Sequence, residues 1–188
     1  MTPRIKPLDL DVARRAAVAV GIPDHLAELS VFRVALRSPN VAAALHGMLH
    51  HLLFEGTFDA RRRELIIMRL GWGSGSVYEW TQHWRVAGLL AVDPDDVLAV
   101  RDWRASYRFD RTDRAVLAAT DEVLTSGTIT DQTWTACAEV LDEVALVELV
   151  AIIANWRLFA SVLMSWQVPL EEGVEPWPPD GRRPSQMD

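Results

Sequence analysis

The sequence has very little cysteine: Cys137 is the only one among 188 residues. An intramolecular disulfide needs two cysteines, and so does a redox couple in which one thiol attacks and a second resolves the product. The chain can form neither by itself. Cys137 lies near Trp134 in a segment with helical periodicity, and we expect it to be a small, buried apolar residue.

Positive charge is also scarce. The chain has 19 Lys and Arg against 26 Asp and Glu, a formal net charge of −7. Nucleic-acid-binding domains usually carry a basic stripe that meets phosphates, so this class is disfavoured. The one dense basic run, residues 61–63, begins an expected helix, where a solvated helix end is the simplest interpretation. We expect no nucleic-acid partner.

Long uninterrupted apolar runs are missing. The longest apolar segment, residues 144–166, contains Glu148, Asn155 and Arg157, which a membrane span would disfavour. We therefore expect a buried core helix there and no membrane partner. The first residues, MTPRIKPLDLD, lack the apolar stretch of a secretory signal. The default expectation is a soluble, cytoplasmic protein.

Strand signals are absent too, since β-branched runs are short and no hairpin dipeptide separates them. Nearly every segment has helical periodicity instead, which predicts an all-α, single-domain array of eight or nine helices. Residues 1–35 are expected to form an N-terminal helical extension and residues 36–168 the main helical domain. Residues 169–188 are proline-rich and should form an extended tail that covers a surface.

The stretch GSGSVYEWTQHWRVAG, residues 73–88, is expected to be a Ser–Gly loop followed by a helix. Glu79 and His83 are four residues apart and therefore share a helix face. A carboxylate beside an imidazole is the usual arrangement of a general base with its orienting partner. The alternative is structural, because Ser76 and Glu79 fit a capping box in which each side chain binds a free backbone N–H.

Glu64 is the third candidate, since its periodic partners Ile67 and Met68 place it on the same face as core residues. A buried glutamate needs a partner or a raised pKa. The alternative is a salt bridge with Arg61 or Arg69.

His46 and His50 have a spacing that metal-binding helices use. No companion acid follows at the expected distance, and two ligands do not complete a site. We expect these histidines to pack or line a pocket, and we predict no metal.

The spacing of Glu64, Ser76, Glu79 and His83 resembles the motif of the carboxymuconolactone decarboxylase and alkylhydroperoxidase-D-like superfamily. In its peroxidase branch two cysteines stand where Ser76 and Glu79 stand here. The decarboxylase branch lacks the cysteine pair and has a glutamate in the second position, as this sequence does.

Segments 37–72, 77–90 and 146–173 are similar to the family's helices, so the resemblance covers roughly residues 35–175. It implies an alkylhydroperoxidase-D-like helical fold, commonly a trimer or hexamer, with residues 36–168 as its domain. Because neither motif position holds sulfur, we expect no thiol peroxidase activity.

The catalytic candidates are Glu64, Glu79 and His83. We expect His83 to be the acid/base, Glu79 to orient it, and Glu64 to relay protons. Such a set could support decarboxylation or isomerisation of a small organic acid or lactone without a cofactor. The alternative is a catalytically degenerate family member that acts as an oligomeric binding or scaffold protein.

Four residues near the motif are candidates for substrate binding, although two of the aromatic ones could equally be core. An arginine should bind a substrate carboxylate, and the sequence leaves three open. The four candidates are Trp72, Ser76, Tyr78 and Trp80, and the arginines are Arg33, Arg69 and Arg85.

Overall fold

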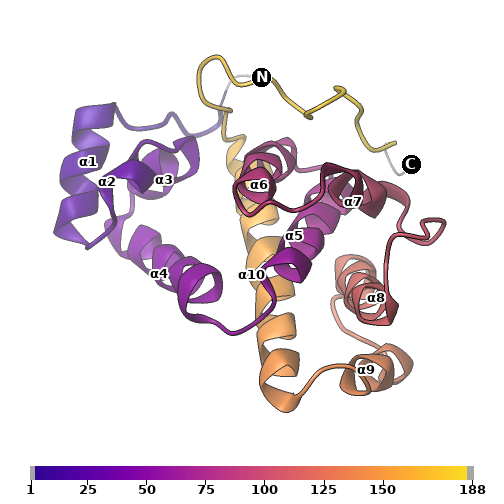
Figure 1. Cartoon of the computed structure of the whole chain (residues 1–188). Helices are drawn as coiled ribbons and strands as arrows, with labels where there is room; N and C mark the ends of the chain where they lie inside the picture. Colours follow the sequence, from indigo (N-terminus) through magenta and orange to yellow (C-terminus); the bar gives the residue numbers. More distant parts are fainter. Residues whose placement is uncertain (1–2, 186–188) are drawn as a thin grey trace. The chain divides into compact units, whose positions relative to one another are not determined.

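The computed structural model describes residues 3–185, and every regular element in that range is helical (Figure 1). The all-α prediction is confirmed. The described range contains ten α-helices rather than the expected eight or nine, and two short ones lie within residues 24–35. The helices are α1 (Leu10–Ala19), α2 (Asp24–Ala27), α3 (Ser30–Ala35), α4 (Pro39–His50), α5 (Ala60–Ser74), α6 (Val77–Leu89), α7 (Pro94–Ala99), α8 (Arg111–Ser126), α9 (Asp131–Ala138) and α10 (Glu143–Trp166). A π-helical segment, His51–Glu55, continues α4, and a 3-10 segment, Val100–Asp102, continues α7.

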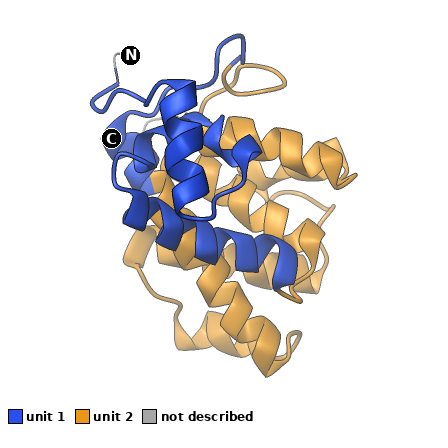
Figure 2. Ribbon diagram, turned by 90° about the vertical axis from the view of Figure 1, so that its left-hand side faces the viewer, with its two compact units in different colours: residues 1–55, 161–175 blue, residues 56–160, 176–188 orange. Residues whose placement is uncertain are grey.

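The chain divides into two compact units, each built from discontinuous segments (Figure 2). Unit 1 consists of residues 1–55 and 161–175, and unit 2 of residues 56–160 and 176–188. All three catalytic candidates lie in unit 2. The three consecutive segments expected from the sequence are a different kind of division and stay a prediction.

The link between α5 and α6 is much shorter than the expected Ser–Gly loop. Gly73 and Ser74 still belong to α5, and Gly75 ends that helix in the left-handed conformation with φ 71°. Glycine adopts this conformation without the strain that a side chain would add. Ser76 then precedes α6 directly. The two helices therefore form a tight hairpin, which brings the middle of α5 beside the first turns of α6.

Gly71 allows this close approach. A Cβ at residue 71 would lie 3.0 Å from the backbone nitrogen of Trp80 and 3.3 Å from Cβ of Glu79. These distances are shorter than ordinary Cβ contacts, so a side chain at residue 71 would push α5 and α6 apart by a few tenths of an ångström. The contact sets the position of Glu79 relative to α5.

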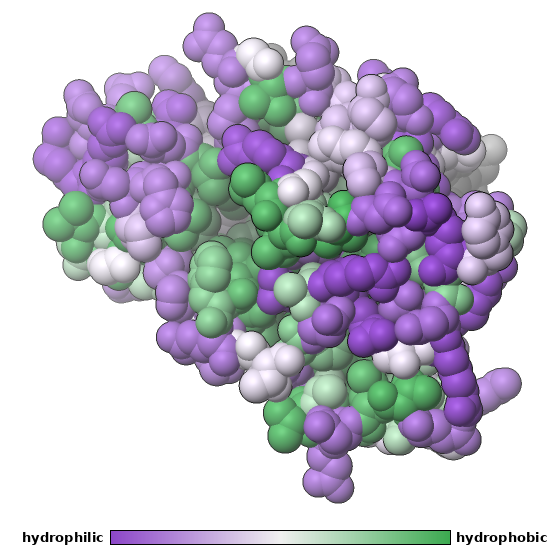
Figure 3. All heavy atoms as spheres, in the orientation of Figure 1, coloured by the Kyte–Doolittle hydropathy of each residue, from purple (hydrophilic) through white to green (hydrophobic). Residues whose placement is uncertain are grey.

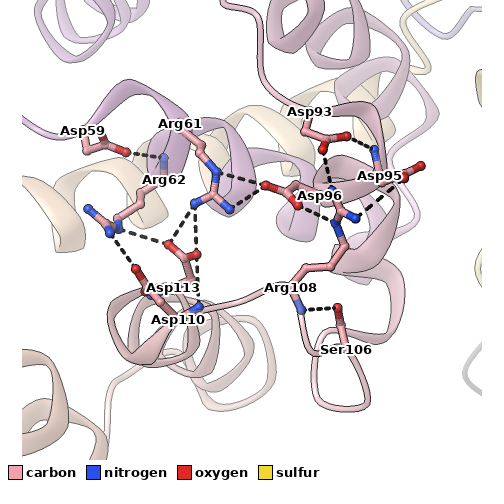
Figure 4. A network of polar contacts seen from close by, with 10 residues as sticks. All are labelled: Asp59, Arg61, Arg62, Asp93, Asp95, Asp96, Ser106, Arg108, Asp110 and Asp113. Atoms are coloured by element: carbon pink, nitrogen blue, oxygen red, sulfur yellow. Dashed lines mark hydrogen bonds and ion pairs between the residues drawn. The ribbon is translucent and has the colours of Figure 1, made fainter.

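Ion pairs hold the beginning of α5 (Figure 4). Arg61 lies 2.7 Å from an Asp96 oxygen and 2.9 Å from an Asp113 oxygen, and Arg62 lies 3.0 Å from Asp113. Arg108 also pairs with Asp96. The expected solvated end for residues 61–63 is therefore wrong, because Arg61 and Arg62 pair with carboxylates and Arg63 is buried beside Glu64.

Helix α10 is the long apolar segment. Of the described helices, it is the one long and apolar enough to cross a membrane by length and composition, yet half of its apolar window is buried. Glu148 on this helix accepts hydrogen bonds from Thr57, whose backbone nitrogen lies 2.9 Å away. These features fit the core helix of a soluble helical protein. Apolar side chains also reach the surface at several places, as the face in Figure 3 shows.

Trp177 and Pro178 of the proline-rich segment lie against α6. Trp177 is buried, and its ring centroid lies 6.0 Å from Trp72 and 6.2 Å from Trp80. The indole N–H of Trp80 donates to the Pro178 carbonyl at 2.7 Å. The backbone N–H of Trp177 donates to Thr81 Oγ1 at 3.2 Å. Three tryptophans thus form an aromatic cluster on one side of α6.

Candidate functional site

The structure brings Glu64, Glu79 and His83 together. Glu64 is fully buried on α5, and its Oε2 lies 2.8 Å from His83 Nδ1. Glu79 Oε2 lies 3.8 Å from His83 Nε2, one helical turn away on α6. A fourth residue completes the set, because the indole N–H of Trp156 on α10 donates to His83 Nε2 at 3.0 Å. We call these four residues the carboxylate–histidine cluster.

The contacts of His83 determine where its proton lies. An indole N–H can only donate, so Nε2 must offer its lone pair to Trp156. Nδ1 then carries the hydrogen and donates it to the Glu64 carboxylate. Both ring nitrogens are engaged, and the arrangement describes a neutral imidazole whose tautomer is set by two neighbours.

Glu64 is held by His83 and by its neighbour Arg63, whose Nε lies 3.4 Å from Glu64 Oε1. The alternative salt bridges are wrong, because Arg61 pairs with carboxylates of α7 and α8, and Arg69 lies 2.5 Å from Asp121. A buried carboxylate is stable when hydrogen-bonded donors face it. The Glu64 carboxylate therefore belongs to the buried carboxylate–histidine cluster and not to a surface salt bridge.

The capping-box interpretation of Glu79 is also wrong. The backbone N–H of Ser76, which Glu79 would bind in such a box, donates to the Gly71 carbonyl at 2.9 Å. The Ser76 hydroxyl does not cap α6, and its Oγ is buried without a hydrogen-bond partner within the part of the chain that is described. The tight α5–α6 hairpin takes the backbone group that a capping box needs, which leaves the Glu79 carboxyl to the cluster.

Burial raises the pKa of Glu79 to about 7. The side chain leaves water when α5 and α6 meet, and an ionised carboxylate loses more by this than a neutral acid does. His83 opposes the increase and the Glu64 carboxylate adds to it. Glu79 therefore exchanges its proton near neutral pH.

Several influences act on the pKa of His83. Burial lowers it, whereas the charge and hydrogen bond of the Glu64 carboxylate raise it, and the net direction is upward. The Trp156 N–H acts against that increase, because it is a partner for the neutral ring alone.

The aromatic candidates separate into two settings. Trp80 is fully buried in a hydrophobic cluster, with the Trp72 ring 5.2 Å away. The guanidinium of Arg101 lies 4.7 Å from each of these rings. This packing supports a core role for Trp72 and Trp80. Tyr78 is buried as well. Substrate binding by Trp72, Ser76, Tyr78 and Trp80 stays a prediction.

The candidate arginines are mostly engaged. Arg33 donates to the Leu8 carbonyl at 2.7 Å, and Arg69 binds Asp121 and the Val100 carbonyl. Arg85 is exposed on α6. A substrate carboxylate would therefore compete with existing partners at Arg33 and Arg69.

The remaining titratable candidates are two histidines of unit 1 and the single cysteine. The rings of His46 and His50 lie 5.6 Å apart at an angle of 41°, and no group of three or more metal-ligating side chains occurs within residues 3–185. Cys137 is fully buried, and burial raises the pKa of its thiol to about 11. A thiol in that state is a poor nucleophile at neutral pH.

Trp156 is the residue that sequence reasoning missed. It lies in the segment for which the sequence predicts only a buried core helix, and polar Asn155 and Arg157 flank it. That polar interruption was the available signal. Nothing in the spacing could pair α10 with α6, because 73 residues separate the two partners.

The helical array has an alkylhydroperoxidase-D-like fold, and the sequence contains no pair of cysteines. Residues 39–122 match the model of the Carboxymuconolactone decarboxylase family, and this region contains Glu64, Glu79 and His83. This part of the chain is therefore similar to that family, in agreement with the resemblance of its motif. No curated protein matches the sequence.

Solved structures share the fold over most of the chain. An alkylhydroperoxidase AhpD core protein from Ralstonia eutropha, an uncharacterized peroxidase-related protein, aligns with a TM-score of 0.74 at 16% identity, covering 90% of this chain and 93% of that one. A variant of the debrominase Bmp8 in complex with 2,3,4-tribromopyrrole aligns with a TM-score of 0.72 at 19% identity, covering 92% and 94%. An uncharacterized peroxidase-related protein from Silicibacter aligns with a TM-score of 0.69 at 14% identity, covering 92% and 91%. At these identities the likeness shows the fold alone.

Proposed function

We propose that the protein is a cofactor-independent enzyme, a lyase or isomerase, that moves a proton on a small organic acid or lactone. One observation carries the proposal: the buried Glu79 carboxyl has a pKa of about 7 and lies 3.8 Å from His83 Nε2. A general acid or base works best when its pKa is near the working pH. Strongly shifted carboxyls of this kind gather at functional sites.

Within this proposal Glu79 donates and accepts the proton, rather than His83 as the sequence suggested. Both ring nitrogens of His83 already have partners, Glu64 at 2.8 Å and Trp156 at 3.0 Å. The Glu79 carboxyl, by contrast, lies 3.8 Å from His83 Nε2, which is longer than a hydrogen bond. His83 and Glu64 then set the electrostatic surroundings in which Glu79 works.

Two reaction types suit such a group. Loss of CO₂ from a β-keto acid leaves an enolate, and the neutral Glu79 acid would give its proton to the carbon. In an isomerisation the Glu79 carboxylate would take a proton from a carbon beside a carbonyl and return it at another carbon. Neither step requires a thiol, in keeping with a sequence that has one cysteine.

Solvent hydrogen exchange tests the proposal without knowledge of the natural substrate. Small β-keto acids and unsaturated lactones are incubated in D₂O with the protein and followed by proton NMR. We expect deuterium at the carbon beside the carbonyl, and at least a 100-fold slower exchange for Glu79→Gln. Glu172→Gln, at an exposed glutamate, is the matched control and should retain the wild-type rate.

The opposite result would favour the other function. If no compound in the panel exchanges or reacts, and Glu79→Gln behaves as wild type throughout, the enzyme proposal is wrong. A binding or scaffold role, with the family fold retained and catalysis lost, would then be the better description.

We also propose that the protein forms a homo-oligomer, a trimer or hexamer, in the cytoplasm. Support comes from large apolar residues exposed on α10: Val144 at 59%, Val147 at 70% and Leu158 at 47%. Exposed apolar residues along one helix often mark an association surface. Native mass spectrometry should show an oligomer that Val147→Glu dissociates and that Val18→Glu, at an equally exposed valine of α1, leaves intact. A monomeric wild type would contradict this, and cell fractionation tests the location.

A further inference from the structure

We propose that Trp156 is a positioning residue that keeps His83 neutral and thereby places the mobile proton of the site on Glu79. This inference rests on the proposed function, because it assigns the state in which that site begins its work. It concerns a residue on α10 that no motif of the sequence includes.

The donor character of the indole carries the argument. Trp156 Nε1 lies 3.0 Å from His83 Nε2. An imidazolium would present an N–H at Nε2, so two donors would face each other at hydrogen-bond distance. The indole nitrogen has no lone pair to accept, and no change of tautomer can relieve the conflict. The contact therefore exists only with a neutral ring.

Packing keeps the donor in place. Trp156 is 1% exposed, and its ring meets that of His83 edge-on, with centroids 5.7 Å apart and planes at 79°. A buried indole cannot turn aside without opening a large void in the surrounding core. His83 is equally constrained, because Nδ1 is held by Glu64 at 2.8 Å. Neither ring can easily rotate out of the contact.

Every charged group that faces His83 enters the balance. Glu64 from α5 and Glu79 from α6 favour an imidazolium, and Arg63 from α5 disfavours it. Trp156 from α10 also disfavours the imidazolium, because it donates a hydrogen bond that only the neutral ring can accept.

Glu79 is the other place for the proton. Its Oε2 lies 3.8 Å from the same Nε2 that Trp156 occupies. If His83 took the proton, Nε2–H could pair with an anionic Glu79, and the site would hold an ion pair. With Nε2 occupied by the indole, the stable arrangement is a neutral imidazole beside a neutral carboxylic acid.

The test reads protonation directly. Imidazole ¹⁵N shifts and the Glu79 side-chain ¹³C shift are followed across pH in wild type, in Trp156→Phe and in the control Trp134→Phe, at a half-exposed tryptophan of α9. In wild type we expect a neutral His83 with hydrogen on Nδ1 around pH 7. Trp156→Phe should raise the pKa of His83 by about one unit, since the neutral ring loses a hydrogen bond. The pKa of Glu79 should fall in the same variant, and Trp134→Phe should change neither.

Two results would overturn the inference. One is an unchanged titration of both groups in Trp156→Phe. The other is an imidazolium at pH 7 in wild type, which needs no variant and therefore decides the matter even if Trp156→Phe does not fold. A scalar coupling between indole ¹⁵Nε1 and imidazole ¹⁵Nε2 in wild type would support it directly.

These measurements need no substrate. A neutral His83 combined with absent hydrogen exchange would therefore refute the proposed function while leaving the protonation state established. Hydrogen exchange by the protein together with a charged His83 would instead support the proposed function and refute the inference about Trp156.

Discussion

The raised pKa of Glu79 makes a quantitative prediction about stability. Burial raises that pKa from its ordinary 4.5 to about 7. At about 1.4 kcal/mol for each pKa unit, the folded state loses about 3 kcal/mol relative to the unfolded state when Glu79 ionises. The sign follows from proton binding: between these two pKa values the folded chain binds the extra proton, so the stabilisation is complete below pH 4.5 and is lost as the pH rises through about 7.

Glu79→Gln isolates this contribution, because glutamine is a neutral group of nearly the same shape. Urea unfolding of wild type and variant should give similar free energies near pH 5. Near pH 9 the variant should be more stable by up to about 3 kcal/mol, since wild type must then hold a buried carboxylate. Glu172→Gln should follow wild type at both pH values. The reasoning fails if the Glu79→Gln and wild-type curves run parallel from pH 5 to pH 9. A variant that gains stability while losing hydrogen exchange would fit a residue kept for activity.

Three further substitutions, the first with a matched control, test the packing of unit 2 by thermal or urea unfolding. Gly71→Ala places a Cβ 3.0 Å from the backbone of α6 and should destabilise by about 1–3 kcal/mol. Gly88→Ala, where a Cβ meets nothing within 4 Å, should be neutral or stabilising, and equal effects at both glycines would refute the close-approach argument. Asp113→Ala removes a 3% exposed carboxylate that two arginines share and should destabilise by about 3 kcal/mol; no change would mean that the pairs contribute nothing. Trp177→Ala should destabilise by about 3 kcal/mol and open the tail to proteolysis, and unchanged protection would show that the tail is held by other contacts.

Much of the fold could be predicted from local signals. Asp59 accepts from the Arg62 backbone at 2.9 Å and begins α5, and Asp110 and Asp113 form a capping box that begins α8. Gly127 ends α8 in the left-handed conformation, with φ 84°. These signals act within one turn of helix, so the sequence alone contains them.

One local signal failed because a second local motif, the C-terminal cap of α5, uses the same backbone group. Ser76 and Glu79 have the spacing of a capping box, but the Ser76 N–H donates its hydrogen bond to the Gly71 carbonyl instead. Gly73 and Ser74, which suggest a loop, continue α5, and the helix ends only at left-handed Gly75. The C-terminal cap of α5 therefore takes the Ser76 N–H that a capping box of α6 would need, so one local motif excludes the other.

The sequence by itself determined the all-helical class, the shared face of Glu79 and His83, and the absence of a thiol pair. Each follows from composition or from the helical repeat, which relates residues three or four apart. Only the tertiary structure decided which groups these side chains meet. Glu64 reaches His83 across the α5–α6 hairpin and Trp156 reaches it from α10, at sequence separations of 19 and 73 positions. The protonation of His83 and the pKa of Glu79 depend on those distant partners and on burial, because a helical repeat contains no information about which helix lies opposite.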